Sequence, residues 1–110
     1  MTIQEMFDKA YIGLASQHFE QCNSSGQCVY SDGNGKHCAW GWVDKSLGMF
    51  TNYNVRHLYN ERIGIAATLD EEQLDFTLDL QWAHDRDEFC IKQNLKNLAE
   101  RYNLTIPNVD

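Results

Sequence analysis

Two helical patterns near the end of the chain are separated by only three residues, and this short connection constrains the fold more than any other feature. The first pattern opens with a capping box, Thr68 with Glu71, and runs to about His84. The second starts after Asp85-Arg86-Asp87 and repeats apolar residues at helical spacing. Its inward residues are Phe89, Ile91, Leu95, Leu98, Ala99 and Tyr102. So short a connection predicts an antiparallel helical hairpin.

Both helices of this hairpin carry further positions that we expect to be structural. In the first helix, Leu74, Leu78 and Trp82 fall four residues apart, which is the spacing of one helix face that packs on a core. At the end of the second helix, Asn103 followed by Leu104 is typical of a left-handed C-terminal cap.

The N-terminal part of the chain also follows helical spacing. A capping box of Thr2 with Glu5 opens a helix that we expect to reach about Phe19. Its apolar stripe consists of Ile3, Met6, Phe7, Ala10, Tyr11, Leu14, Ala15 and His18.

The middle of the chain is less regular. Cys28-Val29-Tyr30 is expected to be a short extended piece, a second helix is expected from about His37 to Leu47 with Gly48 as its stop, and residues 49–67 have no clear period. With 110 residues, 43% of them hydrophobic, the chain can bury one ordinary core. We therefore expect an all-α or mostly α fold, with α+β as the alternative, in one compact helical domain over residues 1–110.

The charge balance excludes some partners. The formal net charge of −7 disfavours direct binding to nucleic acid or to an anionic membrane and favours a protein with a basic surface. The first residues lack a basic leader, and no apolar run approaches the roughly 18 residues of a membrane span. We therefore expect a cytoplasmic protein with reduced cysteines.

Cysteine and histidine raise the question of a metal site. The ligand types of structural zinc occur at Cys22, Cys28, His37 and Cys38. No Cys-x-x-Cys pair presents two sulfurs from one turn, and adjacent residues do not easily share one metal. Cys28, His37 and Cys38 are therefore weak metal candidates, buried free thiols are the simpler interpretation, and no cofactor is expected.

A cysteine nucleophile is a further alternative. Cys38 follows Lys36 at the expected start of a helix, where the helix dipole lowers the pKa of a thiol. His84 and Asp85 offer a base and a group to orient it, but neighbouring residues seldom form such a pair. Asp85 is more simply a helix cap, and no catalytic residue is assigned.

Acidic residues recur along the first helix of the hairpin. Glu71, Asp75 and Asp79 fall at i, i+4 steps with Glu72 beside them, and like charges at this spacing repel. A solvated helix whose first acids interact with the helix dipole explains Glu71 and Glu72 but not Asp79. These four residues are the predicted contact with a basic protein.

Aromatic residues suggest a different kind of site. Tyr30 and Trp40, with Lys36 and Arg56 to meet a phosphate, are the candidates for binding a small nucleotide-like ligand. Trp42 and Trp82 are expected in the core, which leaves Trp40 as the exposed ring.

The order of these features resembles a protein family. Cys28-x-Tyr30, then Gly35-x-x-Cys38-Ala39-x-Gly41, then Leu80-Gln81-x-x-His84-Asp85, is similar to a pattern shared by small proteins of phages and prophage regions. The resemblance implies an accessory protein that acts inside a bacterial host. Small phage proteins of this kind often antagonise host defence or host enzymes.

The sequence thus predicts a non-enzymatic protein that inhibits or sequesters a host factor, such as an anti-phage defence protein, through its acidic helix. The alternatives are a sponge for a nucleotide-like ligand, a cysteine-dependent enzyme and a structural zinc module. A homodimer is plausible for so small a domain, but no apolar stripe in the sequence identifies its face.

Overall fold

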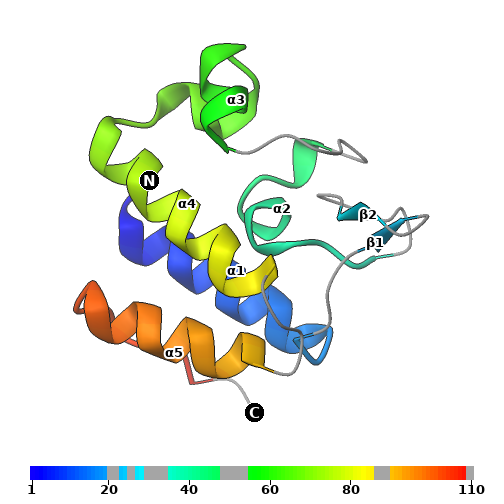
Figure 1. The fold of residues 1–110 in the computed structure, drawn as a ribbon, viewed down its shortest axis with the longest axis vertical. Helices are drawn as coiled ribbons and strands as arrows, with labels where there is room; N and C mark the ends of the chain where they lie inside the picture. The colour runs from blue at the N-terminus through cyan, green and yellow to red at the C-terminus, as the bar shows by residue number, and fades with distance from the viewer. Residues whose placement is uncertain (20–22, 25–26, 29–34, 48–54, 86–89, 109–110) are drawn as a thin grey trace.

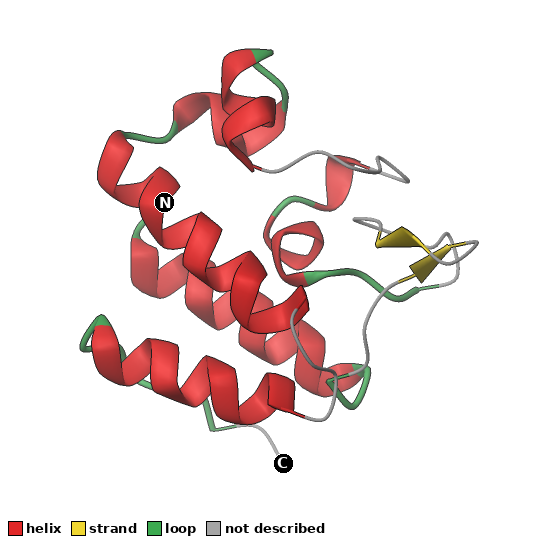
Figure 2. Cartoon of the chain, in the orientation of Figure 1, coloured by secondary structure: helices red, strands yellow, loops and turns green. Residues whose placement is uncertain are grey.

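The computed structural model describes residues 1–19, 23–24, 27–28, 35–47, 55–85 and 90–108. Its α-helices are α1 (Ile3–Ser16), α2 (Ala39–Val43), α3 (Val55–Asn60), α4 (Glu71–Asp85) and α5 (Ile91–Arg101). Two 3-10 helices, η1 (Lys45–Leu47) and η2 (Gly64–Thr68), and two strands, β1 (Asn23–Ser24) and β2 (Gln27–Cys28), complete the described elements. The strands pair antiparallel, with Asn23 opposite Cys28. Helices dominate the described chain (Figure 2), so the predicted mostly α fold class is confirmed.

The capping box predicted at the start of α1 is present. The Glu5 amide donates to the Thr2 hydroxyl over 3.1 Å, and the Thr2 amide donates to the Glu5 carboxylate over 2.9 Å. The helix then buries five residues of the predicted stripe, namely Met6, Phe7, Ala10, Tyr11 and Leu14. His18 lies beyond the end of α1 and is exposed, so the stripe is shorter than predicted.

The predicted hairpin of α4 and α5 is confirmed, and the two helices lie side by side in opposite directions (Figure 1). The Asn94 amide donates to the Ala83 carbonyl over 3.2 Å, and near the other end the rings of Phe76 and Tyr102 meet edge to face at 4.9 Å. The predicted cap at Asp85 and the inward position of Phe89 fall outside the residues whose side chains the structure describes.

The start of α4 differs from the prediction. The Gln73 amide donates to the Asp70 carboxylate over 2.8 Å, and the Asp70 amide donates to the Gln73 side chain over 3.0 Å. Asp70 and Gln73 therefore form the box that was assigned to Thr68 and Glu71. The reason is that η2 runs through Thr68, whose hydroxyl donates to the Ile65 carbonyl instead.

The inward positions predicted for α4 are also partly wrong. Leu74 is buried, but Leu78 is 41% exposed and Trp82 is 55% exposed. A step of four residues turns an α-helix by about 40° beyond a full rotation, so Trp82 lies about 80° around the helix from Leu74. The helix instead buries Leu74, Phe76, Thr77, Leu80 and Ala83.

Helix α2 packs against both α1 and α4, and two glutamines anchor it. Gln17 accepts a hydrogen bond from the Trp42 indole over 3.0 Å and exchanges two hydrogen bonds with the backbone of His37. From the other side, Gln81 accepts from the Trp40 amide over 2.9 Å. The predicted helix from His37 to Leu47 is in fact two short helices, α2 and η1.

Asp44 lies between α2 and η1, and its buried carboxylate accepts hydrogen bonds from both η1 and η2. It accepts from the amide and hydroxyl of Ser46 and, over 2.8 Å, from the amide of Ile65 in η2. A Cβ on Gly64, which has a φ of +62°, would clash with the same carboxylate. The stretch 49–67 that had no clear period thus contains α3 and all of η2 except its last residue, Thr68. Gly48 and Tyr30 lie outside the described residues.

Three helices end in the same hydrogen-bonded turn. After α5, Leu104 donates to the Ala99 carbonyl and Asn103 to that of Glu100, with Asn103 at a φ of +56°. This is a Schellman motif, and it confirms the predicted left-handed cap. The same pair of bonds ends α1 and α3, with His18 and Arg62 at positive φ.

Over the described ranges, no helix combines the length and the hydropathy needed to cross a membrane.

Candidate protein-binding surface

The solvent-facing side of α4 carries acidic and apolar residues together. We define the outer face of α4 by Glu71, Asp75, Leu78, Asp79 and Trp82, which recur at three- and four-residue spacing. Glu72 is exposed beside them. The sequence did contain a signal for this face, in the four-residue steps from Leu74 to Leu78 and Trp82. Each such step advances about 40° around the helix, which places Leu78 and Trp82 progressively closer to solvent.

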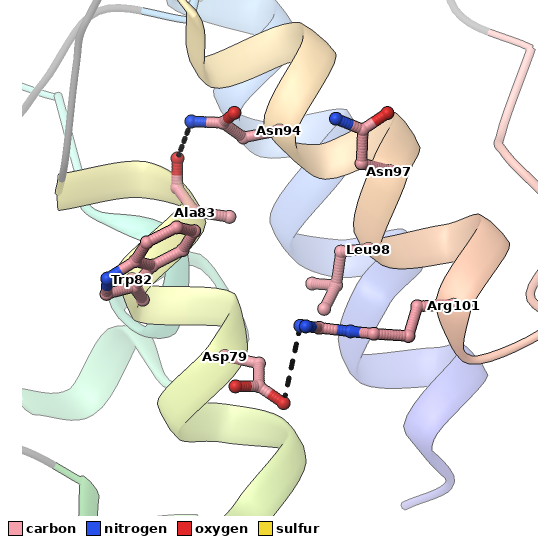
Figure 3. Close-up of a pocket in the computed structure, with 7 residues that line it drawn as sticks. All are labelled: Asp79, Trp82, Ala83, Asn94, Asn97, Leu98 and Arg101. Carbon is pink, nitrogen blue, oxygen red and sulfur yellow. Dashed lines mark hydrogen bonds and ion pairs between the residues drawn. The ribbon is translucent and has the colours of Figure 1, made fainter.

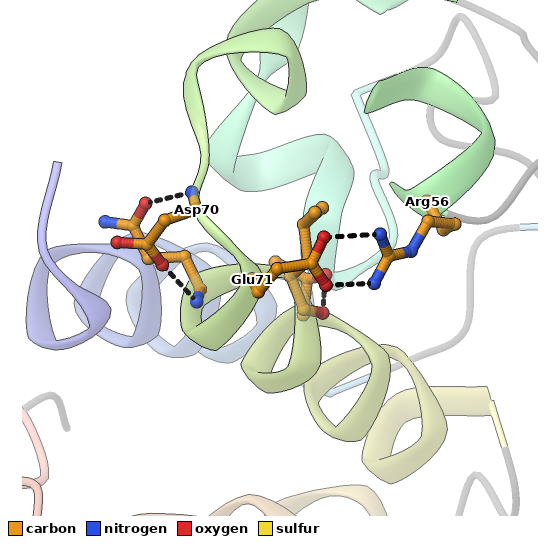
Figure 4. A network of polar contacts seen from close by, with 6 residues as sticks. Arg56, Asp70 and Glu71 are labelled. Carbon is orange, nitrogen blue, oxygen red and sulfur yellow. Dashed lines mark hydrogen bonds and ion pairs between the residues drawn. The ribbon is translucent and has the colours of Figure 1, made fainter. Parts of the chain in front are cut away.

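Glu71 begins the outer face and is already paired with Arg56 of α3 (Figure 4). The Arg56 guanidinium donates to both carboxylate oxygens, over 3.0 Å and 2.7 Å. These hydrogen bonds, and then the attraction of the opposite charge, hold the pKa of Glu71 below its ordinary value. Because both groups are exposed, solvent screens the pair and it contributes little to stability. It does orient both side chains.

Asp79 lies further along α4 and contacts α5 twice. Its carboxylate accepts from the Tyr102 hydroxyl over 2.5 Å and lies 3.5 Å from the Arg101 guanidinium. Burial, and then the bond to Asp79, raises the pKa of Tyr102 to about 12. Two of the four acids predicted to contact a basic protein therefore have partners within the chain. Asp75 and Glu72 are exposed, and neither makes an ion pair with any described residue.

A hollow of about 270 Å³ lies beside Asp79, between α4 and α5 (Figure 3). It is lined by Asp79, Trp82, Ala83, Asn94, Asn97, Leu98 and Arg101. The exposed Trp82 ring stands on one side, and the Arg101 side chain extends from α5 on the other. A carboxylate, a guanidinium, an indole ring and two side-chain amides thus line one hollow. Sequence reasoning missed this hollow because it depends on how α5 lies against α4.

The residues predicted to bind a small ligand do not form an exposed aromatic site. Trp40 was expected to be the exposed ring, but its exposed fraction is 0% because α2 is enclosed by α1 and α4. Trp42 is partly buried, whereas Trp82, which was placed in the core, is the most exposed of the three indoles. Arg56 is paired with Glu71, Lys36 is half-buried, and Tyr30 lies outside the described residues.

The metal and thiol candidates have structural contacts where they are described. The Cys38 sulfur accepts from the Gly41 amide over 3.4 Å and caps α2, and its side chain is buried. The His37 ring stands edge to face against Trp42 at 4.5 Å. In the part of the chain that the structure describes, no three His, Cys, Asp or Glu side chains gather as metal ligands. The side chain of Cys28, like those of Cys22, His84 and Asp85, falls outside that part.

Comparison of the chain with protein-family models, with curated proteins and with solved structures gives no match in any of the three.

Proposed function

We propose that this chain is a non-enzymatic binding protein that inhibits or sequesters a host protein, using the outer face of α4 to contact a basic surface. The observation that carries the proposal is the joint exposure of Leu78 and Trp82 among acidic residues on one helix face. The resemblance to phage accessory proteins favours a host defence factor as the target.

The composition of this face fits a protein partner. Tryptophan is enriched among the residues that dominate binding energy at interfaces, and apolar side chains there are commonly rimmed by polar ones. The surrounding carboxylates and the net charge of −7 would accelerate encounter with a positively charged surface. Leu78 and Trp82 would then supply apolar contact area after the encounter.

Charge also argues against a second copy of this chain as the partner. A symmetric dimer through α4 places the same patch on both subunits, so Asp75 and Asp79 of one copy would approach carboxylates of the other. Like charges facing each other across an interface oppose association. A basic, different protein is the complementary occupant.

The test combines one charge reversal and one apolar substitution on the outer face. Asp75→Lys with Leu78→Ser should abolish capture of the host partner, because the double variant removes attraction and apolar contact together. Both side chains are exposed, so thermal stability should be preserved. Capture would be measured by quantitative pull-down from host lysate, followed by binding measurements on the purified partner.

The matched control makes the same chemical changes elsewhere. Glu100→Lys on α5 and Ile12→Ser on α1 alter exposed residues away from the outer face of α4. This control should capture the partner as the original chain does. If the Asp75→Lys, Leu78→Ser variant binds the purified partner with unchanged affinity, the proposal is wrong.

A further inference from the structure

The hollow between α4 and α5 has the chemistry of a socket for a guanidinium group. We propose that it receives an arginine side chain of the basic partner, which takes the place that Arg101 holds beside Asp79. This inference rests on the proposed function, because it names the side chain through which a basic partner is recognised.

The Asp79 carboxylate is held in a fixed orientation with one oxygen available to a cation. The Tyr102 hydroxyl and the Arg101 guanidinium both contact the same carboxylate oxygen, Oδ2. The other oxygen, Oδ1, accepts no hydrogen bond from any described residue. The Tyr102 hydrogen bond fixes the carboxylate in the wall of the hollow, so it need not be reoriented when a ligand arrives. An incoming guanidinium can use both oxygens in the two-pronged geometry that carboxylates favour.

The other lining residues suit the flat shape of a guanidinium. The Trp82 ring is 55% exposed, and arginine is the cation that most often stacks on an indole face. Asn94 uses its amide N–H to reach the Ala83 carbonyl, which leaves its side-chain oxygen as an acceptor. Lysine carries a compact ammonium that cannot stack in this way, so the socket should prefer arginine.

Arg101 shows that a guanidinium fits at this position, where it also lies 5.7 Å from the centre of the Tyr102 ring. Its distance of 3.5 Å to Asp79 exceeds the 2.7 Å between Arg56 and Glu71, and its side chain is 61% exposed. Exposed pairs of this kind contribute little, so displacing Arg101 should weaken ligand binding by at most about fivefold. Arg101 is therefore a weak internal competitor for the socket.

The inference is tested with defined peptides, without the host partner. The ¹⁵N-labelled full-length protein is titrated with acetyl-Gly-Arg-Gly-amide, and the indole N–H signal of Trp82 is followed by NMR. The arginine peptide should shift this signal in a saturable way. The peptide with citrulline, which has nearly the same shape without the charge, should bind at least tenfold more weakly, and the lysine peptide should bind more weakly than arginine.

Three substitutions identify the groups involved. Asp79→Asn keeps an acceptor for Tyr102 but removes the charge, and should weaken arginine binding by about tenfold. The control Glu100→Gln should bind the arginine peptide with unchanged affinity. The indole N–H signal of Trp82 reports binding for both Asp79→Asn and this control. Arg101→Ala removes the competitor and should strengthen binding by about two- to fivefold. Trp82→Ala should weaken binding, with the backbone amides of Asn94 and Asn97 as reporters.

The outcomes separate this inference from the proposed function. Equal binding of arginine and citrulline peptides, or binding unchanged by Asp79→Asn in a variant of unaltered thermal midpoint, would overturn the socket. Asp75 and Leu78 do not line the hollow, so the pull-down variant tests the outer face independently. Arginine binding at the socket, together with partner capture that survives Asp75→Lys and Leu78→Ser, would support the socket and contradict the proposed function.

Discussion

Gly13 is the residue whose size matters most for the packing of α1 on α2. A Cβ at this position would overlap the Trp42 indole, near the base of the side chain. The indole cannot move away cheaply, because its N–H is held by Gln17 and its ring contacts His37. Glycine in the middle of a helix is normally unfavourable, so its presence in α1 has a packing reason.

We expect Gly13→Ala to lower the free energy of unfolding, by up to about 2 kcal/mol. Alanine favours the helix by roughly 1 kcal/mol over glycine, but forcing an extra methyl into a filled space costs about 1–3 kcal/mol. Urea denaturation measures the difference. In a Trp42→Ala background the same substitution should become stabilising, because the clash is gone. A stabilising effect in both backgrounds would show that the contact does not matter.

The three tryptophans show why side-chain burial was harder to predict than helix position. Each lies in or next to an apolar helical pattern, and composition alone favours burial for all three. Trp40 is fully buried because α2 has neighbours on two sides, and Trp82 is exposed because α5 covers a different side of α4. The deciding information is the position of a neighbouring helix, which the local sequence does not contain.

At the scale of elements, α4 had two overlapping capping signals. Thr68 with Glu71 and Asp70 with Gln73 both fit the spacing of a capping box, and the chain uses the second. The long helices α1, α4 and α5 follow from apolar spacing and caps. The short elements α2, η1 and η2 do not, since side chains such as Gln81 and Asp44 hold their backbone from other parts of the chain.

The choice between these two caps can be measured. Asp70→Ala should lower the free energy of unfolding by about 1 kcal/mol, the usual effect of losing an N-cap acceptor. Thr68→Ala should change it by less than about 0.5 kcal/mol, because the exposed Thr68 hydroxyl makes only a local bond within η2. Thermal and urea unfolding of both variants would decide. A larger loss for Thr68→Ala would reverse the assignment.

At the scale of the whole molecule, charge is concentrated on the outside and is mostly negative. Two of the predicted partner-binding acids, Glu71 and Asp79, have partners in α3 and α5, a fact that no single-helix pattern contains. The row of acidic residues could be predicted from the sequence. The exposure of Leu78 and Trp82 and the adjacent hollow could not, since they depend on how α4 and α5 pack.

The net charge of −7 should make stability depend on salt. Raising the ionic strength from about 0.01 M to 0.15 M shortens the screening length from about 30 Å to 8 Å and weakens repulsion between carboxylates. We therefore expect the thermal midpoint to rise over this range in sodium chloride. Asp75→Lys with Glu100→Lys changes the formal charge from −7 to −3, since each replacement adds two, and should reduce the rise. An equal rise in both proteins would contradict this explanation.

The Schellman turns after α1 and α3 have a consequence for engineering. His18 and Arg62 hold positive φ angles of 57° and 59°, where a side chain costs roughly 1–2 kcal/mol and glycine does not. The hydrogen bonds of each turn come from the backbone, so glycine at either corner would keep them all. Glycine at these two positions should therefore give a more stable scaffold. On it, the outer face of α4 could be redesigned to bind chosen proteins without loss of the fold.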